Sequence, residues 1–343
     1  MIASVLAGML LTTDQKSVVF RELIAKPGRW IQKPTSLKAL RGKVVLLDFW
    51  AYSCVNCLRT FPYLKEWYRR YHTDGFEIVG IHRPEFDFER DPANVTAAVK
   101  RFGFSWPILS DPQRENWDLY GVFGWPTKIL IDGEGHQTLF RVAEGNDLLF
   151  EQEIQKELRK LHPGIKLPHL MSPVRATDKP GAICRPVTAE LYTSIKGLPL
   201  KRVCYTSADI GVKKFFSYPA HLGEDVAYLS GDWTPMKHSL VPDGNGSNLK
   251  LRYMAKELNA VFVSDHPVRV EIYQNGKPAA PADLGGDVHL AKGVPTVVVN
   301  GPRMYSLLRN HAWTHGELEL KVKEAGLQLY EFSFSTDCVT PVK

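Results

Sequence analysis

Apolar residues in the first half of the chain fall into two kinds of pattern, continuous runs and helical repeats. The run Val44–Trp50 (VVLLDFW) is apolar except for Asp48, which is typical of a central strand buried on both faces. Between about Asn56 and Tyr71, apolar side chains recur near one face at helical spacing. Together the two patterns indicate a strand that passes directly into a helix.

The same two patterns alternate as far as residue 161. Strands are predicted at Phe76–His82, Lys128–Asp132 and Thr138–Val142, and helices at Pro92–Phe102 and Leu148–Leu161. Strands that alternate with helices predict an α/β fold for this part of the chain.

After residue 161 the pattern changes twice. Proline occurs at 163, 168, 173, 180 and 186, which is typical of a linker between domains. Short alternating segments separated by turn residues follow, and they predict an all-β sandwich of jelly-roll-like type. The predicted organisation is a first domain at 1–161 with an N-terminal extension, a Pro-rich linker at 162–186 and a β-sandwich at 187–343. The alternating segments are Val226–Leu229, Asn248–Tyr253, Ala260–Val263, Val268–Gln274, Thr296–Asn300, Glu317–Val322 and Leu327–Phe334.

Composition narrows the class of protein. The 343 residues are 44% hydrophobic and 23% charged, which excludes a wholly disordered chain. The 43 basic and 37 acidic residues are interleaved, so the net charge of +6 does not form a nucleic-acid-binding stripe. No apolar run reaches the roughly 18 residues that suggest a membrane helix. The apolar stretch Ile2–Leu11 is a truncated signal segment, the stump of an upstream segment or a short packed element, and these alternatives stay open.

Cys54 and Cys57 carry the strongest chemical signal in the chain. Two cysteines separated by two residues can close a disulfide across one helical turn, and the predicted helix begins beside them. At a helix N-terminus, unpaired backbone N–H groups and the helix dipole are expected to lower the pKa of Cys54, whose thiolate is the attacking species. A zinc site would need another pair of ligands, whereas Cys184, Cys204 and Cys338 are single and distant. A chance buried pair is the remaining alternative.

The segments around the cysteine pair resemble a known family. KVVLLDFWAYSCVNC matches the thioredoxin pattern of a strand followed by the catalytic cysteines, and GVFGWPTKILIDGEG matches its later proline loop and strand. Both segments are similar to extracytoplasmic thioredoxin-like thiol-disulfide oxidoreductases of the TlpA and ResA type. More narrowly, CVNCLRTFPYLKEWYRRY and HRPEFDFERDPANV resemble the soluble C-terminal part of DipZ-like proteins. There, a β-sandwich similar to a carbohydrate-binding module follows a thioredoxin-like domain.

The resemblance implies a catalytic role for four residues. Cys54 would be the nucleophile and Cys57 the resolving cysteine. Pro126 matches the cis-proline of the loop beside the cysteines. Asp48 matches the buried acid of thioredoxin, whose raised pKa would let it exchange a proton with the resolving thiol. A structural carboxylate at Asp48 and an ordinary trans proline at Pro126 are the alternatives.

Substrate contact is expected at four further residues. The resemblance implies that the backbone of Trp125 pairs with a substrate chain as an added strand. Ser53 stands where thioredoxin has tryptophan, and Val55 and Asn56 stand where it has glycine and proline. Because neither histidine nor arginine lies between the cysteines, we expect the reducing half of the span from about −270 to about −120 mV.

The expected activity is thiol-disulfide exchange with protein substrates, in the reductase direction. The resemblance implies a membrane electron donor and a location in the periplasm or cell envelope. No cofactor beyond a Cys54–Cys57 disulfide and no metal is expected. Glu85 and Glu89 are interpreted as a salt-bridged loop, with a proton carrier as the alternative. If the protein is exported, two of Cys184, Cys204 and Cys338 form a structural bridge whose pairing the sequence does not assign.

A second hypothesis makes the chain an envelope-binding or glycan-binding protein whose β-sandwich recruits it, with redox activity secondary. Aromatic residues suit either a sugar platform or a sandwich core, and core is the favoured interpretation. A thiol peroxidase is disfavoured because the P-x-x-x-[ST]-x-x-C pattern does not occur around Cys54. The aromatic residues in question are Trp233, Tyr253, Tyr273, Tyr305 and Trp313.

Overall fold

The computed structural model describes residues 20–194 and 203–339, and the stretch Ile2–Leu11 lies outside them. Backbone contacts divide the chain into two compact units. The first contains residues 20–50, 60–83 and 99–171, and the second contains residues 51–59, 84–98, 172–194 and 203–339. The domain boundaries expected at 161 and 187 stay a prediction.

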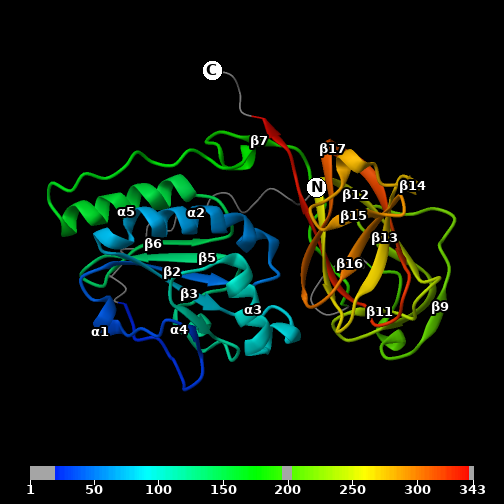
Figure 1. Ribbon diagram of the computed structural model, residues 1–343, viewed down its shortest axis with the longest axis horizontal. Helices are drawn as coiled ribbons and strands as arrows, with labels where there is room; N and C mark the ends of the chain where they lie inside the picture. Colours follow the sequence, from blue (N-terminus) through cyan, green and yellow to red (C-terminus); the bar gives the residue numbers. More distant parts are fainter. Residues whose placement is uncertain (1–19, 195–202, 340–343) are drawn as a thin grey trace. The chain divides into compact units, whose positions relative to one another are not determined.

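The first unit is built on a six-stranded mixed sheet with the order β1-β4-β3-β2-β5-β6 (Figure 1). Strands β2, β3 and β4 run parallel, whereas β5, β6 and the edge strand β1 pair antiparallel with their neighbours. The α/β prediction is confirmed, and the predicted strands and helices lie within about one residue of the observed ones. The strands are β1 (Trp30–Gln32), β2 (Val44–Trp50), β3 (Phe76–His82), β4 (Ile108–Ser110), β5 (Thr127–Ile131) and β6 (Gln137–Val142).

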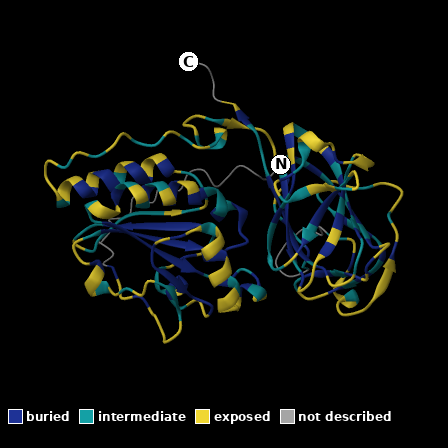
Figure 2. Ribbon diagram, viewed as in Figure 1, coloured by how far each residue is buried: buried dark blue, intermediate teal, exposed yellow. Residues whose placement is uncertain are grey.

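Five α-helices and two short 3-10 helices accompany these strands within residues 20–171. Strands β2, β3 and β5 are buried along their whole length, whereas α2 and α5 alternate buried and exposed positions (Figure 2). That difference reproduces the two sequence patterns, continuous apolar runs and one-sided repeats. The helices are α1 (Leu37–Leu40), α2 (Val55–Tyr71), η1 (His72–Asp74), η2 (Asp87–Arg90), α3 (Pro92–Phe102), α4 (Glu115–Leu119) and α5 (Asp147–Leu161).

In the rest of the described chain, from residue 172, the regular secondary structure is β-strand apart from three short 3-10 helices. Its main sheet is antiparallel and has the order β15-β16-β13-β17-β12-β10-β11-β18-β8. In addition, β14 pairs with β13 and β9 pairs with β10. The all-β prediction is therefore confirmed. The strands are β7 (Ile183–Cys184), β8 (Leu191–Tyr192), β9 (Lys214–Phe216), β10 (Ala227–Pro235), β11 (Leu240–Pro242), β12 (Asn248–Val263), β13 (Val268–Gln274), β14 (Lys277–Pro278), β15 (Val288–Ala291), β16 (Val294–Val299), β17 (Arg303–Val322), β18 (Gln328–Ser335) and β19 (Cys338–Val339). Three 3-10 helices lie between them, η3 (Ala176–Asp178), η4 (Ser207–Asp209) and η5 (Pro281–Asp283).

Strand β12 is longer than either segment that the sequence predicted there. The segments expected at Asn248–Tyr253 and Ala260–Val263 are one strand, β12, which pairs with β17 over most of its length. The first part of β12 also pairs with β10, and its last part pairs with β18. The register of β12 against β17 shifts between Ala255 and Glu257, so a single strand continues through a bend.

The aromatic residues of this part are mainly core residues. Trp233, Tyr253 and Tyr305 are each at most 1% exposed and belong to its hydrophobic core. Lys321 lies over the Tyr273 ring at 3.8 Å, and an arginine lies over the Trp313 ring at 5.4 Å. The core interpretation therefore holds for the three buried rings, while a glycan partner stays a prediction.

A disulfide between Cys184 and Cys338 joins the predicted linker to the last described strand. The two cysteines face each other in the antiparallel pair β7–β19. Cys204 remains an exposed thiol. The structure thus assigns the bridge that the sequence left open. In the described part of the chain, no helix is both long and apolar enough to cross a membrane.

Candidate active site

The cysteine pair lies where strand β2 passes into helix α2. The strand ends at Trp50, the helix begins at Val55, and Cys54 directly precedes the first helical residue. The backbone N–H of Cys57 donates a hydrogen bond to Cys54 Sγ at 3.4 Å. Both residues are in the dithiol form and buried, with exposed fractions of 8% for Cys54 and 0% for Cys57. One helical turn therefore holds two thiols within reach of each other.

The acidity of Cys54 differs from the sequence-based expectation. Burial raises the pKa of its thiol well above the usual range, and the neighbouring Cys57 thiol and the Glu85 carboxylate raise it further. The hydrogen bond from the Cys57 backbone N–H acts in the opposite direction and is the smaller effect. The expectation of a lowered pKa is therefore wrong for this conformation, because desolvation outweighs the helix N-terminus. Burial of Cys54 therefore favours its protonated thiol.

Asp48 lies at the centre of the sheet and has a charged partner that the sequence did not reveal. Burial raises the pKa of Asp48 to about 6, and the positive charge of Lys128 lowers it in part. Lys128 is directly opposite Asp48 in the antiparallel pairing of β2 with β5, and it is 1% exposed. Among the described residues, Asp48 Oδ1 and Lys128 Nζ have no hydrogen-bond partner. The two groups interact through charge alone, inside a low-dielectric core.

Pro126 stands directly before β5 and follows a cis peptide bond from Trp125. Since Thr127 pairs with Phe49, this proline is placed level with the end of β2. The Trp125 ring packs against Trp117, with 4.7 Å between ring centroids. The Arg83 guanidinium covers both rings, at 5.6 Å from Trp125 and 5.7 Å from Trp117. Arg83 and Trp117 are thus neighbours of this loop that sequence reasoning missed.

The residues that flank and separate the cysteines are largely enclosed. Ser53 and Val55 are buried, and the Ser53 hydroxyl and backbone N–H both donate to the carboxylate of Glu89. Asn56 is half-buried and donates to Glu190 Oε1 at 2.9 Å. Substrate contact at Ser53, Val55 and Asn56 stays a prediction. The interpretation of Glu85 and Glu89 as a salt-bridged loop is wrong for Glu89, because its carboxylate is fully buried and accepts hydrogen bonds from Ser53.

Further carboxylates gather near Cys54 within the second compact unit. Burial raises the pKa of Glu331 well above its usual range, and the charges of Glu85, Glu190 and Cys54 raise it further. Glu85 also accepts a hydrogen bond from the Tyr192 hydroxyl. Glu190 and Glu331 were missed because more than a hundred residues separate them from the cysteine motif. Negative charges around a thiol disfavour its thiolate, in line with the raised pKa of Cys54.

A zinc site at the cysteine pair would need further ligands, but Cys184 and Cys338 are bonded to each other in a disulfide. Cys204 is an exposed thiol. Within residues 20–194 and 203–339, no cluster of three or more His, Cys, Asp or Glu side chains could hold a metal ion.

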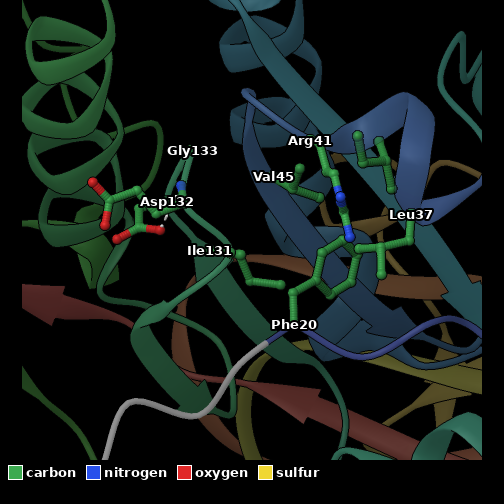
Figure 3. Close-up of a pocket in the computed structure, with 10 residues that line it drawn as sticks. Phe20, Leu37, Arg41, Val45, Ile131, Asp132 and Gly133 are labelled. Atoms are coloured by element: carbon green, nitrogen blue, oxygen red, sulfur yellow. Dashed lines mark hydrogen bonds between the residues drawn. The ribbon is translucent and has the colours of Figure 1, made fainter.

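A pocket of about 280 Å³ lies at the other end of β2 from the cysteines (Figure 3). Phe20, Leu37 and Ile131 point toward one another in it, and Arg41 lies beside them. Its lining includes Val45, near the start of β2, whereas Cys54 follows the end of that strand. A seven-residue strand spans about 20 Å, so the length of β2 lies between the Val45 lining and the residues that lead to Cys54.

A buried strand that leads into Cys-x-x-Cys at a helix start, with a cis-proline before the adjacent strand, defines a thioredoxin-like protein. The AhpC/TSA family model matches residues 22–136, and the model described as thioredoxin like C-terminal domain matches residues 202–335. Thiol-disulfide oxidoreductase ResA of Bacillus thuringiensis is 30% identical over 131 residues, which are 38% of this chain and 70% of that protein. The chain belongs to the family of thioredoxin-like thiol-disulfide oxidoreductases.

Protein DipZ of Mycobacterium bovis is similar over more of the chain. It is 34% identical over 307 residues, which cover 88% of this chain and 40% of DipZ. The chain thus spans about 40% of the length of this relative. A solved structure, a putative thiol:disulfide interchange protein DsbE from Chlorobium tepidum, is 24% identical and has a TM-score of 0.36. That similarity covers 41% of this chain and 96% of the other.

Proposed function

We propose that this oxidoreductase reduces disulfides of protein substrates through Cys54 and Cys57. The observation that carries the proposal is the dithiol at the start of α2, in which the Cys57 backbone N–H donates to Cys54 Sγ. This hydrogen bond acts toward the thiolate, the species that attacks a disulfide, and in part offsets the larger effect of burial on the Cys54 pKa.

The exchange has two balanced steps. Cys54, as the thiolate, forms a bond to one substrate sulfur while the substrate S–S bond breaks, and the other substrate sulfur leaves as a thiolate and takes up a proton. Cys57 then loses its proton and attacks Cys54 Sγ, which releases the second substrate thiol and leaves a Cys54–Cys57 disulfide. Two electrons pass to the substrate, so an external dithiol donor must restore the reduced pair.

We assign supporting roles on the same basis. Asp48, with a pKa of about 6, is titratable near neutral pH and suits the exchange of a proton with the resolving thiol. The segment before β5, Trp125 and Pro126, is proposed to pair with an extended substrate chain. Ser53, Val55 and Asn56 would then contact the substrate around its disulfide. No cofactor other than the Cys54–Cys57 disulfide enters these steps.

The cellular setting belongs to the proposal as well. The DipZ-like sequence pattern supports a site of action in the periplasm or cell envelope, with electrons supplied by a membrane donor. The Cys184–Cys338 bridge agrees with an oxidising compartment, since structural disulfides persist there and are rare in reducing ones. A compartment that oxidises Cys184 and Cys338 would also oxidise Cys54 and Cys57 unless a donor kept them reduced.

The first experiment tests the assignment of the two cysteines. Cys54→Ser should abolish reduction of a protein disulfide, whereas Cys57→Ser should accumulate a mixed disulfide that mass spectrometry detects. Cys204→Ser is the matched control, because it removes an exposed thiol without touching the pair. Full activity of Cys54→Ser would refute the proposed function.

The direction of exchange is tested by equilibrating the pair in glutathione buffers. A potential near the thioredoxin value of about −270 mV would support a reductase. A value near about −120 mV would instead indicate an oxidant that introduces disulfides.

A further inference from the structure

Two acidic residues of the short helix η2 (Asp87–Arg90) have opposite surroundings. The side chain of Asp87 is 70% exposed and pairs with Arg90 on the surface. Glu89, two residues later, is fully buried. A buried carboxylate is costly unless hydrogen bonds compensate for the lost water, so the position of Glu89 requires an explanation.

Four hydrogen bonds supply that compensation. Glu89 Oε1 accepts from the Ser53 backbone N–H at 3.0 Å and from the Ser53 hydroxyl at 2.7 Å. Glu89 Oε2 accepts from the backbone N–H groups of Glu85 at 2.6 Å and Phe86 at 3.2 Å. All four partners are donors, and an ionised carboxylate is the side-chain group that accepts at both oxygens. Glutamine would direct an NH₂ group at one pair of donors.

Electrostatics alone would work against this arrangement. Burial raises the pKa of Glu89, and the hydrogen bonds from Ser53, Glu85 and Phe86 lower it. A charge near Cys54 also disfavours the thiolate that the reaction needs. The buried carboxylate is therefore unfavourable both for its own ionisation and for the Cys54 thiolate. Its hydrogen-bond partners indicate which role offsets these two effects.

The partners of Glu89 connect two loops. Ser53 is the last residue before Cys54, and it is held by both its backbone and its side chain. Glu85 and Phe86 follow strand β3, so the carboxylate ties the entry to α2 to the loop after a buried strand. This contact explains why a serine suits position 53, because its hydroxyl provides one of the four donors to Glu89.

We propose that Glu89 is a positioning residue for Cys54: it fixes Ser53 and thereby sets the exchange rate and the redox equilibrium of the cysteine pair. The proposal rests on the function proposed above. The contact is present in the dithiol form. Closing the disulfide brings the two sulfurs into bonding distance, and a clamp that holds Ser53 in its dithiol position opposes the part of that movement made by Cys54, so it favours the dithiol over the disulfide.

The test compares Glu89→Gln, Ser53→Ala and the double variant with wild type. Asp87→Asn is the matched control, because it removes a carboxylate from the same short helix at an exposed position. Ser53→Ala keeps the charge of Glu89 and removes the 2.7 Å bond, which separates positioning from electrostatics. The readouts are the rate of reaction with a neutral aryl disulfide and the equilibrium constant with glutathione, both measured on variants with a native circular dichroism spectrum.

Glu89→Gln should slow the reaction about tenfold or more, the effect of losing hydrogen bonds to a charged acceptor. Ser53→Ala should slow it by a smaller factor, and the double variant should resemble Glu89→Gln, because both residues act through one contact. The equilibrium should shift toward the Cys54–Cys57 disulfide in all three variants. Asp87→Asn should match wild type in both readouts.

An unchanged equilibrium constant, or a shift toward the dithiol, would overturn the positioning role. Independent effects of the two substitutions would do the same. If Glu89→Gln does not fold, the test rests on Ser53→Ala. A wild-type rate and a wild-type equilibrium constant for Ser53→Ala would then refute the inference. A wild type that reacts while the variants match it refutes only the positioning role. A wild type that does not react refutes the proposed function as well.

Discussion

The chain holds two pairs of cysteines that differ in almost every physical respect. Cys54 and Cys57 are separated by two residues and remain a dithiol, whereas Cys184 and Cys338 are separated by 154 positions and form a disulfide. The first pair is brought together by the start of helix α2, with Cys54 just before the helix and Cys57 in its first turn. The second is created by the pairing of two short strands, β7 and β19. Cysteine side chains thus provide a reactive thiol pair in one region and a structural cross-link in the other.

The difference follows from what each bond does to the unfolded chain. A disulfide across one helical turn restricts few conformations, so it can open and close at a small cost in stability. A bond that closes a loop of 154 residues removes much more freedom from the unfolded state. Reactive pairs are therefore expected to be local, and structural pairs to span long segments.

The largest expected effect concerns the long-range pair. The double variant Cys184→Ser, Cys338→Ser should lower the free energy of unfolding by about 3–5 kcal/mol, because the unfolded chain regains its freedom. Urea unfolding followed by circular dichroism measures the loss. Reduction of protein disulfides through Cys54 should persist under conditions where the variant is folded.

The local pair provides the control for that measurement. Replacing both Cys54 and Cys57 by serine should abolish exchange and change the free energy of unfolding by less than about 1–2 kcal/mol. Equal losses of stability from the two double variants would remove the distinction between a reactive and a structural pair.

Asp48 adds a further difference between the reactive and the structural cysteine pair. It is a buried carboxylate on β2, the strand that leads into the reactive pair, and its ionisation destabilises the folded protein. Its pKa is about 6 in the folded protein against an ordinary value of 3.8. Below pH 3.8 the carboxyl is protonated in both states and costs nothing. As pH rises from there, the unfolded state loses its proton first, so stability falls until the folded carboxyl has also ionised.

The stability advantage of Asp48→Asn over wild type should therefore grow between about pH 4 and pH 6. The shift corresponds to about 3 kcal/mol, and Lys128 is present in both proteins. Urea titrations at a series of pH values provide the measurement. A difference that stays constant across this range would mean that Asp48 does not titrate in the folded protein as its burial implies.

The sequence predicted those features that depend on residues close together in the chain. Strand β2 and helix α2 were visible because a buried strand is a continuous apolar run and a covering helix repeats at its own period. The division of β12 into two strands was wrong because Lys256 and Glu257 interrupt the apolar alternation. They lie where the register against β17 shifts, and the strand continues through that bend.

Features that depend on register or on loop conformation were not accessible in the same way. Lys128 is an evident charged residue in the run TKILI, but its position opposite Asp48 requires the pairing of β5 with β2. The contact between Ser53 and Glu89 joins two loops whose shapes no local pattern specifies. The pairing of Cys184 with Cys338 likewise depends on two-residue strands that are too short to predict.

Cys204 gives the smallest expected effect and the last test of the comparison. It is an exposed thiol that belongs to neither pair. Cys204→Ser should change the free energy of unfolding by less than about 0.5 kcal/mol, as is usual for a surface substitution. The rate of exchange through Cys54 should stay at the wild-type value. A slower exchange would mean that a third cysteine takes part, for example by resolving a mixed disulfide in place of Cys57. The contrast between one reactive pair and one structural pair would then be incomplete, and mass spectrometry of the trapped Cys57→Ser intermediate would show which sulfur is involved.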